Sequence, residues 1–179
     1  DAEALTILEG KKNRILLRQK EAIDARWSYR SMLGGVLAQE TDRAVETTAE
    51  MKPVTKVAPT AEELTDLVFA TKLVKHSKSN AIVLSKGGQL IASGVGQTSR
   101  VDALKQAIEK ARHFGFDLKG AVLASDAFFP FDDCVTLAAE AGITAIAQPG
   151  GSVRDADSIA AADRLGVAMV MTGVRHFKH

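Results

Sequence analysis

The chain has 179 residues, of which 46% are hydrophobic and 25% are charged, and its mean hydropathy is +0.00. This length and composition are typical of a globular protein with one domain or two small subdomains. Because 23 basic residues balance 22 acidic ones, and because no apolar run approaches the roughly 18 residues that cross a bilayer, we expect neither nucleic acid nor a membrane as a partner.

The first 58 residues carry weak structural signals. Apolar residues at positions 4–8 predict a short helix that ends at Gly10, and the run at 15–17 predicts a strand. Residues 29–39 alternate loosely around Gly34-Gly35, which indicates an extended segment with either a bulge or a close approach of another backbone. The polar stretch 47–59 contains two prolines and predicts a connection or an edge strand.

From Thr60 onward the pattern is stronger. Thr60 with Glu63 forms the signature of a capping box, followed by helical spacing up to Lys75. We further predict strands at 81–84 and 90–93 joined by a tight turn, a helix capped by Ser99, a strand at 121–124, a helix capped by Asp132, a strand at 143–147, a helix at 155–165 and a strand at 168–171. Strands that alternate with helices predict an α/β fold, a layered mixed sheet with helices on its faces.

Three loops follow predicted strands, where α/β sheets bind ligands. Residues 94–100 form a glycine-rich turn that ends at Arg100, either an anion site or a turn with a surface arginine. Residues 149–154 contain Gly150-Gly151, Ser152 and Arg154, which suit a ligand or a helix start that needs positive φ. Residues 125–132 hold three phenylalanines and a proline, which we interpret as walls of a pocket for a flat ring, although core packing can use one or two of them.

The chain closes on the basic residues 175–179. A frayed tail is one interpretation. Because Arg175 directly follows the last strand, the alternative is that Arg100, Arg154 and Arg175 converge on a phosphate. Asn80 opens a strand with an amide donor and acceptor, whereas the neighbouring Lys75 and His76 are explained by the helix dipole.

Several other chemistries find little support in the sequence. The single cysteine, Cys134, excludes an intrachain disulfide and a zinc site with two thiolates, and indicates a reducing, cytoplasmic compartment. The chain has no zinc-deaminase signature, nucleophile elbow, P-loop or HExxH helix. Cys134 lies in a predicted helix and is expected in the core.

Taken together, the loops closely resemble one family, the bifunctional purine biosynthesis protein AICAR transformylase/IMP cyclohydrolase. The matching segments span nearly the whole chain: Ser79–Ala81, Gly94–Arg100, Ser125–Phe131, Gln148–Ser152 and Arg175–His179, and upstream Lys11–Asn13, Tyr29–Ser31 with Gly34-Gly35, and the helix ending at Lys75. The resemblance implies a cytidine-deaminase-like α/β fold without zinc. It also implies that residues 1–58 end a preceding transformylase subdomain, or are connecting strands, and that residues 59–179 form the C-terminal transformylase subdomain.

The resemblance implies an enzyme that transfers a formyl group from 10-formyltetrahydrofolate to AICAR in IMP synthesis. Asn80 would orient the reacting amine by contacting the carboxamide. The implied substrate-binding residues are Asn80, Arg100, Phe128, Pro130, Ser152, Arg175 and His179, and the implied folate-binding residues are Val101, Phe128, Pro130 and Phe131. A structural potassium ion and a homodimer also belong to what the family implies.

The resemblance also shows what this chain does not contain. Family members are about three times as long and carry the cyclohydrolase domain first, and their catalytic lysine–histidine pair precedes the region matched here; Lys75-His76 does not correspond to it. We therefore expect a C-terminal fragment that partners the remaining N-terminal polypeptide and is inactive alone. The alternative is a free-standing nucleotide- or phosphate-binding module without catalysis.

Overall fold

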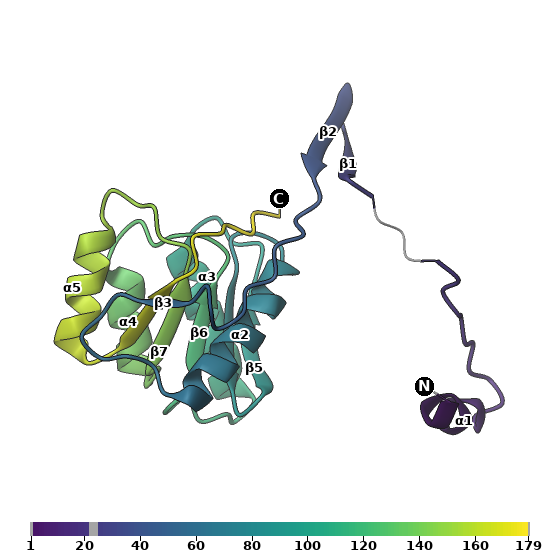
Figure 1. The fold of residues 1–179 in the computed structure, drawn as a ribbon, viewed down its shortest axis with the longest axis horizontal. Helices are drawn as coiled ribbons and strands as arrows, with labels where there is room; N and C mark the ends of the chain where they lie inside the picture. The colour runs from purple at the N-terminus through teal and green to yellow at the C-terminus, as the bar shows by residue number, and fades with distance from the viewer. Residues whose placement is uncertain (1, 22–24, 179) are drawn as a thin grey trace. The chain divides into compact units, whose positions relative to one another are not determined.

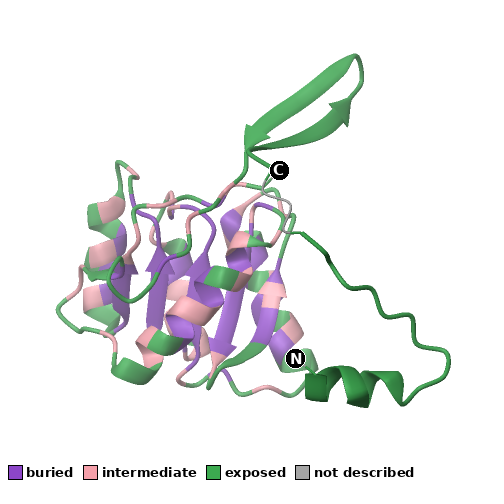
Figure 2. Ribbon diagram, turned by 45° about the vertical axis from the view of Figure 1, so that its right-hand side comes forward, coloured by how far each residue is buried: buried purple, intermediate pink, exposed green. Residues whose placement is uncertain are grey.

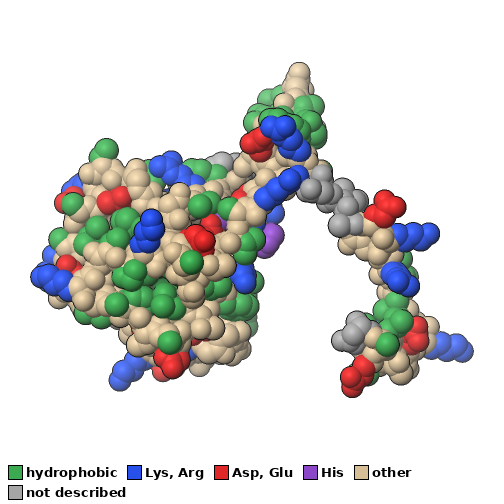
Figure 3. Space-filling model, viewed as in Figure 1, with side chains coloured by type: hydrophobic (Ala, Val, Ile, Leu, Met, Phe, Trp, Pro, Cys, Tyr) green, Lys and Arg blue, Asp and Glu red, His purple; other side chains and the backbone are tan. Residues whose placement is uncertain are grey.

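The computed structural model describes residues 2–21 and 25–178, and contacts within the chain divide it into two compact units, Asp1–Arg43 and Ala44–His179. The N-terminal unit contains helix α1 (Ala2–Glu9) and an antiparallel hairpin of β1 (Trp27–Met32) and β2 (Gly35–Glu40) (Figure 1). Its described side chains are not buried, and hydrophobic side chains are visible on the hairpin surface (Figure 3). This unit therefore has no core of its own.

The prediction of a strand at residues 15–17 is wrong. These residues lie outside any strand, and Ile15 and Leu17 are exposed. An isolated apolar run forms a strand only when a neighbouring strand accepts and donates its backbone hydrogen bonds. The glycine pair at 34–35, in contrast, marks the turn of a hairpin rather than a bulge in one extended segment.

The C-terminal unit is built on a six-stranded mixed sheet in the order β3-β8-β7-β6-β4-β5 (Figure 1). Its strands are β3 (Lys52–Pro53), β4 (Ile82–Lys86), β5 (Gln89–Gly94), β6 (Val122–Ser125), β7 (Ala145–Gln148) and β8 (Ala168–Met171). Strands β6, β7 and β8 are parallel, whereas β4 runs antiparallel to both β5 and β6, and β3 runs antiparallel to β8. The predicted mixed sheet is confirmed.

Helices cover both faces of this sheet. Alternate strand residues divide between two buried clusters: Ile82 and Leu84 pack on the side of α3 (Arg100–His113), α4 (Asp133–Ala141) and α5 (Asp155–Leu165), and Val83 packs on the side of α2 (Ala61–Lys75). Figure 2 shows the buried residues concentrated in the strands and on the inner sides of the helices. The core therefore lies in two layers around one sheet, as the alternation of strands with helices predicts.

The predicted helix caps hold with one exception. Thr60 and Glu63 form the full capping box, and the Ser99 side chain accepts a hydrogen bond from the Asp102 backbone N–H. Asp132, however, makes no capping bond, because its backbone has helical rather than extended angles (φ −82°, ψ −2°).

The segment that precedes α2 is part of the C-terminal unit. Residues 44–58 belong to the C-terminal unit, because Lys52-Pro53 pairs with β8 and the Val54 N–H donates to Met169 O. The edge strand predicted within 47–59 is thus confirmed. The assignment of the chain's segments to subdomains of a longer protein stays a prediction. Each helix among the described residues is too short or too polar to span a bilayer.

Candidate functional site

The loops singled out in the sequence lie along one edge of the main sheet. The parallel strands β6, β7 and β8 place the loops that follow them at the same edge. The antiparallel register sets Ile82 opposite both Ser125 and Gly94, which brings the start of β4 and the end of β5 to that edge as well. This edge, called the rim below, therefore gathers the positions Asn80, Arg100, Phe128, Ser152 and Arg175.

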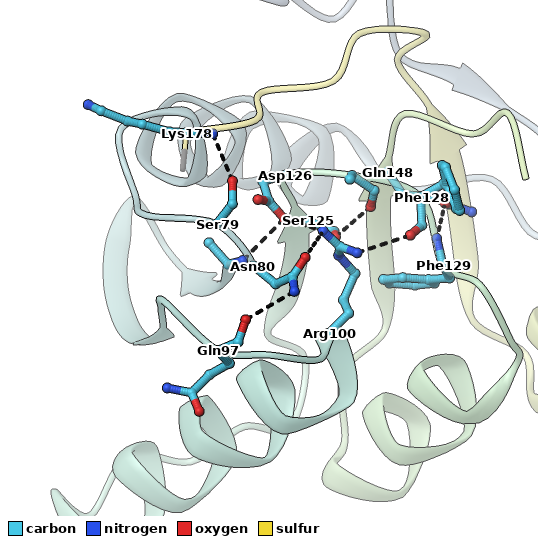
Figure 4. Close-up of polar contacts among 12 residues, drawn as sticks. Ser79, Asn80, Gln97, Arg100, Ser125, Asp126, Phe128, Phe129, Gln148 and Lys178 are labelled. Carbon is cyan, nitrogen blue, oxygen red and sulfur yellow. Dashed lines mark hydrogen bonds and ion pairs between the residues drawn. The ribbon is translucent and has the colours of Figure 1, made fainter. Parts of the chain in front are cut away.

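A buried polar network occupies the rim at β4 and β6 (Figure 4). Arg100 Nη2 donates to Asp126 Oδ1 at 2.7 Å and to Asn80 Oδ1 at 2.9 Å, and Arg100 Nη1 lies 3.4 Å from the Phe128 carbonyl oxygen. Asn80 Nδ2 in turn donates to the Gln97 carbonyl at 3.0 Å. Each end of the Asn80 amide is thereby fixed, while its second N–H and a second oxygen lone pair remain for a ligand.

Asp126 is the site residue that the sequence analysis did not single out. Its side chain is 0% exposed and also accepts the Ala81 N–H at 3.1 Å. Among the described residues, Asp126 Oδ2 and Arg100 Nε have no hydrogen-bond partner. The signal that marks Asp126 is an acidic residue one position beyond a fully buried strand, which needs a cationic partner nearby.

The three arginines each have their own partner within the chain. Arg100 is paired with Asp126, Arg154 Nε donates to Asp157 Oδ2 at 2.7 Å, and the Arg175 guanidinium lies 4.7 Å from the centroid of the Phe128 ring. Because Arg100 is 9% exposed and neutralised by a carboxylate, its geometry favours a role in holding the rim over direct phosphate binding. Convergence of the three arginines on a phosphate stays a prediction.

The aromatic loop is divided between core and surface. Phe129 is 0% exposed, and its N–H donates to Gln148 Oε1 at 3.0 Å, so this ring belongs to the core. Two other loop residues are half-buried, Phe128 and Pro130, and so is Val101 in α3. Phe131 is 50% exposed, and the Arg154 guanidinium lies 5.1 Å from the centroid of its ring. The apolar surface accessible to a flat ring is therefore provided by Phe128, Pro130 and Phe131.

The glycine loop after β7 lies against the arginine that follows β8. Gly150 and Gly151 have φ of +72° and +91°, and a side chain at Gly151 would place its Cβ 3.2 Å from Arg175 Nη2. Ser152 is half-buried, and its Oγ accepts the Arg154 N–H at 3.1 Å, as expected near a helix start. Positive φ alone accounts for these glycines, yet their loop also borders the Arg175–Phe128 pair.

The terminal tail, residues 172–178, is bound to the rim rather than frayed. Its N–H groups donate to successive loops: Gly173 to the Pro149 carbonyl, His176 to the Asp126 carbonyl, and Lys178 to Ser79 Oγ (Figure 4). The Ser79 N–H donates back to the Lys178 carbonyl at 2.9 Å. His179, a predicted substrate-binding residue, lies outside the described residues.

The structure gives no described cluster of three or more histidine, cysteine or carboxylate side chains that could hold a metal ion. The expectations of a potassium ion and of a fold without zinc stay predictions. Cys134 is buried, as predicted, and this burial, with a smaller contribution from the Asp133 charge, raises the pKa of its thiol to about 12. A neutral, inaccessible thiol of this kind is not a nucleophile.

Comparisons with known proteins agree with the resemblance. The family model described as AICARFT/IMPCHase bienzyme matches residues 1–110. The chain is 63% identical over 179 residues to the bifunctional purine biosynthesis protein PurH of Bacteroides thetaiotaomicron, and 51% identical over 182 residues to that of Aquifex aeolicus. Each match covers 100% of this chain and 35% of the relative, so the chain spans about a third of the relatives' length.

Solved structures give a weaker likeness. A dCMP deaminase from the cyanophage S-TIM5, in complex with dCMP and dUMP, has a TM-score of 0.44 and 19% sequence identity, covering 62% of this chain and 98% of that chain. A deaminase/reductase from Thermotoga maritima, named for diaminohydroxyphosphoribosylaminopyrimidine, has a TM-score of 0.43 and 25% identity, covering 59% of this chain and 34% of that chain. Likenesses at this level carry no conclusion about chemistry.

Proposed function

Because the chain belongs to the AICARFT/IMPCHase bienzyme family, we propose that it is the C-terminal part of an AICAR formyltransferase acting in purine biosynthesis. The reaction moves a formyl group from 10-formyltetrahydrofolate to the 5-amino group of AICAR. The amine nitrogen bonds to the formyl carbon, the bond from that carbon to N10 of the folate breaks, and the amine proton leaves while N10 gains one. The products are FAICAR and tetrahydrofolate, and the longer polypeptide also carries IMP cyclohydrolase activity.

The observation that carries this proposal is the Asn80–Arg100–Asp126 network at the rim. An amide that orients a carboxamide must itself be held, and Asn80 is held at its oxygen by Arg100 and at its nitrogen by the Gln97 carbonyl. The half-buried amide keeps one donor and one acceptor site for the carboxamide of AICAR. In this proposal Arg100 serves the substrate through Asn80, and Asp126 balances its charge.

The remaining predicted contacts fit the two substrates. Arg175 is exposed at the rim beside Phe128 and the glycine loop, where its guanidinium can take an anionic group, and Ser152 lies in that loop. The accessible faces of Phe128, Pro130 and Phe131 suit the aromatic rings of a folate. Val101, which directly follows Arg100 in α3 and is half-buried, is proposed as a further folate contact. His179 lies outside the described residues, and its role as a nucleotide contact is proposed from the family resemblance alone.

The proton-transfer residues of the reaction are proposed to lie in the rest of the polypeptide, as the resemblance implies. General acid–base groups contribute about 10²–10⁴-fold to a rate. In this proposal the rim residues bind and orient the substrates. Among the described rim residues, the Asp126 carboxylate is fully buried and paired with Arg100, so it is not placed to act as the general base. A homodimer that completes the site is part of the same proposal.

A formyl-transfer assay tests the proposal. We expect the full-length protein to convert AICAR with 10-formyltetrahydrofolate, and residues 1–179 alone to show negligible turnover. Calorimetry with AICAR on both proteins tests the alternative, a nucleotide-binding module without catalysis. That alternative predicts that AICAR binds but that the full-length protein transfers no formyl group. Turnover by residues 1–179 equal to that of the full-length protein would contradict the proposed division of the site.

A further inference from the structure

The side chains of Glu46 and His176 form a buried acid–imidazole pair. Glu46 Oε2 and His176 Nε2 are 3.0 Å apart, and the two residues are 3% and 2% exposed. They are separated by 130 positions in the sequence. Glu46 belongs to the segment that enters the C-terminal unit before β3, and His176 belongs to the terminal tail.

The tail that carries His176 has no regular secondary structure, yet it lies along the rim beside Phe128, Asp126 and Ser79. Arg175, on one side of His176, places its guanidinium over Phe128. The His176 N–H donates to the Asp126 carbonyl, and Lys178, on the other side, exchanges two hydrogen bonds with Ser79, the residue before Asn80. The backbone around His176 thus contacts both ends of the polar network.

The Glu46 side chain binds the terminal tail through a buried contact with the His176 ring. Terminal segments fray unless side chains tie them to the core, and a buried imidazole without a partner is costly. The segment around Glu46 is itself fixed, because Lys75 Nζ donates to the Ala44 carbonyl at 2.5 Å and Met51 is buried in the core. The pair therefore connects the tail to a rigid part of the fold.

We propose that Glu46 is a positioning residue for the AICAR site: through His176 it holds the terminal tail so that Arg175 lies on Phe128 and Ser79 holds Asn80 in place. Glu46 itself touches no substrate. This inference rests on the proposed function, but its structural half, the fixing of the tail, is measurable without any turnover.

The test uses the full-length protein and compares Glu46→Ala, Glu46→Gln and Glu50→Ala. Glu50 lies four positions away on the same segment, is exposed, and its carboxylate accepts hydrogen bonds from the Thr47 N–H and hydroxyl, so Glu50→Ala is the matched control. Loss of the pair in Glu46→Ala is expected to raise KM for AICAR roughly tenfold with a smaller change in kcat. Glu46→Gln keeps a hydrogen-bonding partner for the ring and is expected to stay within about threefold of the unmodified protein.

Hydrogen exchange supplies the readout that is independent of activity. The amides of His176 and Lys178 are expected to lose protection at least roughly tenfold in Glu46→Ala, and to keep it in Glu46→Gln and Glu50→Ala. Unchanged protection in Glu46→Ala overturns the inference, as does an unchanged KM for AICAR when protection is lost. If the unmodified protein transfers no formyl group, the proposed function fails, and the exchange data alone then decide whether Glu46 holds the tail.

A double-mutant cycle separates positioning from simple destabilisation. Because Glu46 is argued to act through His176, adding His176→Ala to Glu46→Ala is expected to change KM and amide protection little further. Additive effects of the two substitutions contradict the inference. Should Glu46→Ala fail to fold, Glu46→Asp, which shortens the side chain by one methylene group, replaces it with the same directions expected and a smaller KM change.

Discussion

The carboxylate of Asp126 lies 2.7 Å from the guanidinium of Arg100, and the two side chains are 0% and 8% exposed. Asp126 comes directly after β6, and Arg100 is the first residue of α3, so this ion pair joins the end of a strand to the start of a helix at the rim. The same guanidinium nitrogen holds the Asn80 oxygen. One buried charge pair therefore links the stability of the sheet edge to the orientation of the proposed substrate amide.

Asp126→Asn tests how much the Asp126–Arg100 ion pair contributes to the free energy of unfolding. The substitution leaves the buried Arg100 charge without its counter-ion, and we expect the free energy of unfolding in urea to fall by about 3–5 kcal/mol. The matched control is Asp157→Asn, which removes an ion pair of the same 2.7 Å length from two half-exposed side chains and is expected to cost about 0–1 kcal/mol. Equal losses for the two variants would contradict the importance of burial.

Gly94→Ala tests the close approach of β5 to α3. A Cβ at Gly94 would lie 1.8 Å from the carbonyl oxygen of Ala103, so helix α3 must move to accept it. We expect a loss of about 1–3 kcal/mol or more in unfolding free energy. Gly35→Ala is the control, because no atom lies within 4 Å of its Cβ position, and its effect in the same urea titration is expected to stay within about 0.5 kcal/mol. A harmless Gly94→Ala would show that the helix is not packed on this strand.

Arg175→Ala tests the rim arginine in the full-length protein. If Arg175 holds the anionic or carboxamide part of AICAR, calorimetry should show binding weakened by about 1–3 kcal/mol. Arg112→Ala is the control, since Arg112 is exposed near the end of α3 that lies away from Arg100. An unchanged affinity for AICAR in Arg175→Ala removes this residue from the site.

The buried thiol predicts a pH dependence. Burial raises the pKa of Cys134 from 9.0 to about 12, so above pH 9 the unfolded chain loses this proton while the folded chain keeps it. Its stabilising contribution is therefore complete below pH 9 and is lost as the pH rises toward 12, by up to about 1.4 kcal/mol per pH unit. Unfolding free energies measured from pH 8 to 11 should decline less steeply for Cys134→Ala than for the unmodified chain. Identical slopes would contradict the raised thiol pKa.

A truncation tests the division into units. Among the described residues, the buried apolar side chains lie at position 51 and beyond, so we expect residues 44–179 to unfold in urea with a cooperative transition. Residues 1–43, whose described side chains are not buried, are expected to show no cooperative transition alone. Cooperative loss of structure by residues 1–43 in isolation would show that this segment is a domain.

Local sequence signals determined most of the elements of the C-terminal unit. The Thr60–Glu63 capping box, the Ser99 cap and the apolar runs act through neighbouring residues, so their effects can be read along the chain. The same logic failed at residues 15–17, where a strand required a partner that the described chain does not supply. The three phenylalanines of the aromatic loop were predicted as a group, but only packing separates the core ring of Phe129 from the exposed ring of Phe131.

By itself, the sequence determined the α/β pattern, the positions of the rim loops and the family, because each follows from residue spacing and motifs along the chain. The tertiary structure alone decided which charged groups face one another. Asp126 with Arg100, and Glu46 with His176, join positions 26 and 130 residues apart, and no local pattern encodes such pairs. Their partners are chosen by burial, because a charge or an imidazole removed from water must find its counterpart wherever the fold brings one.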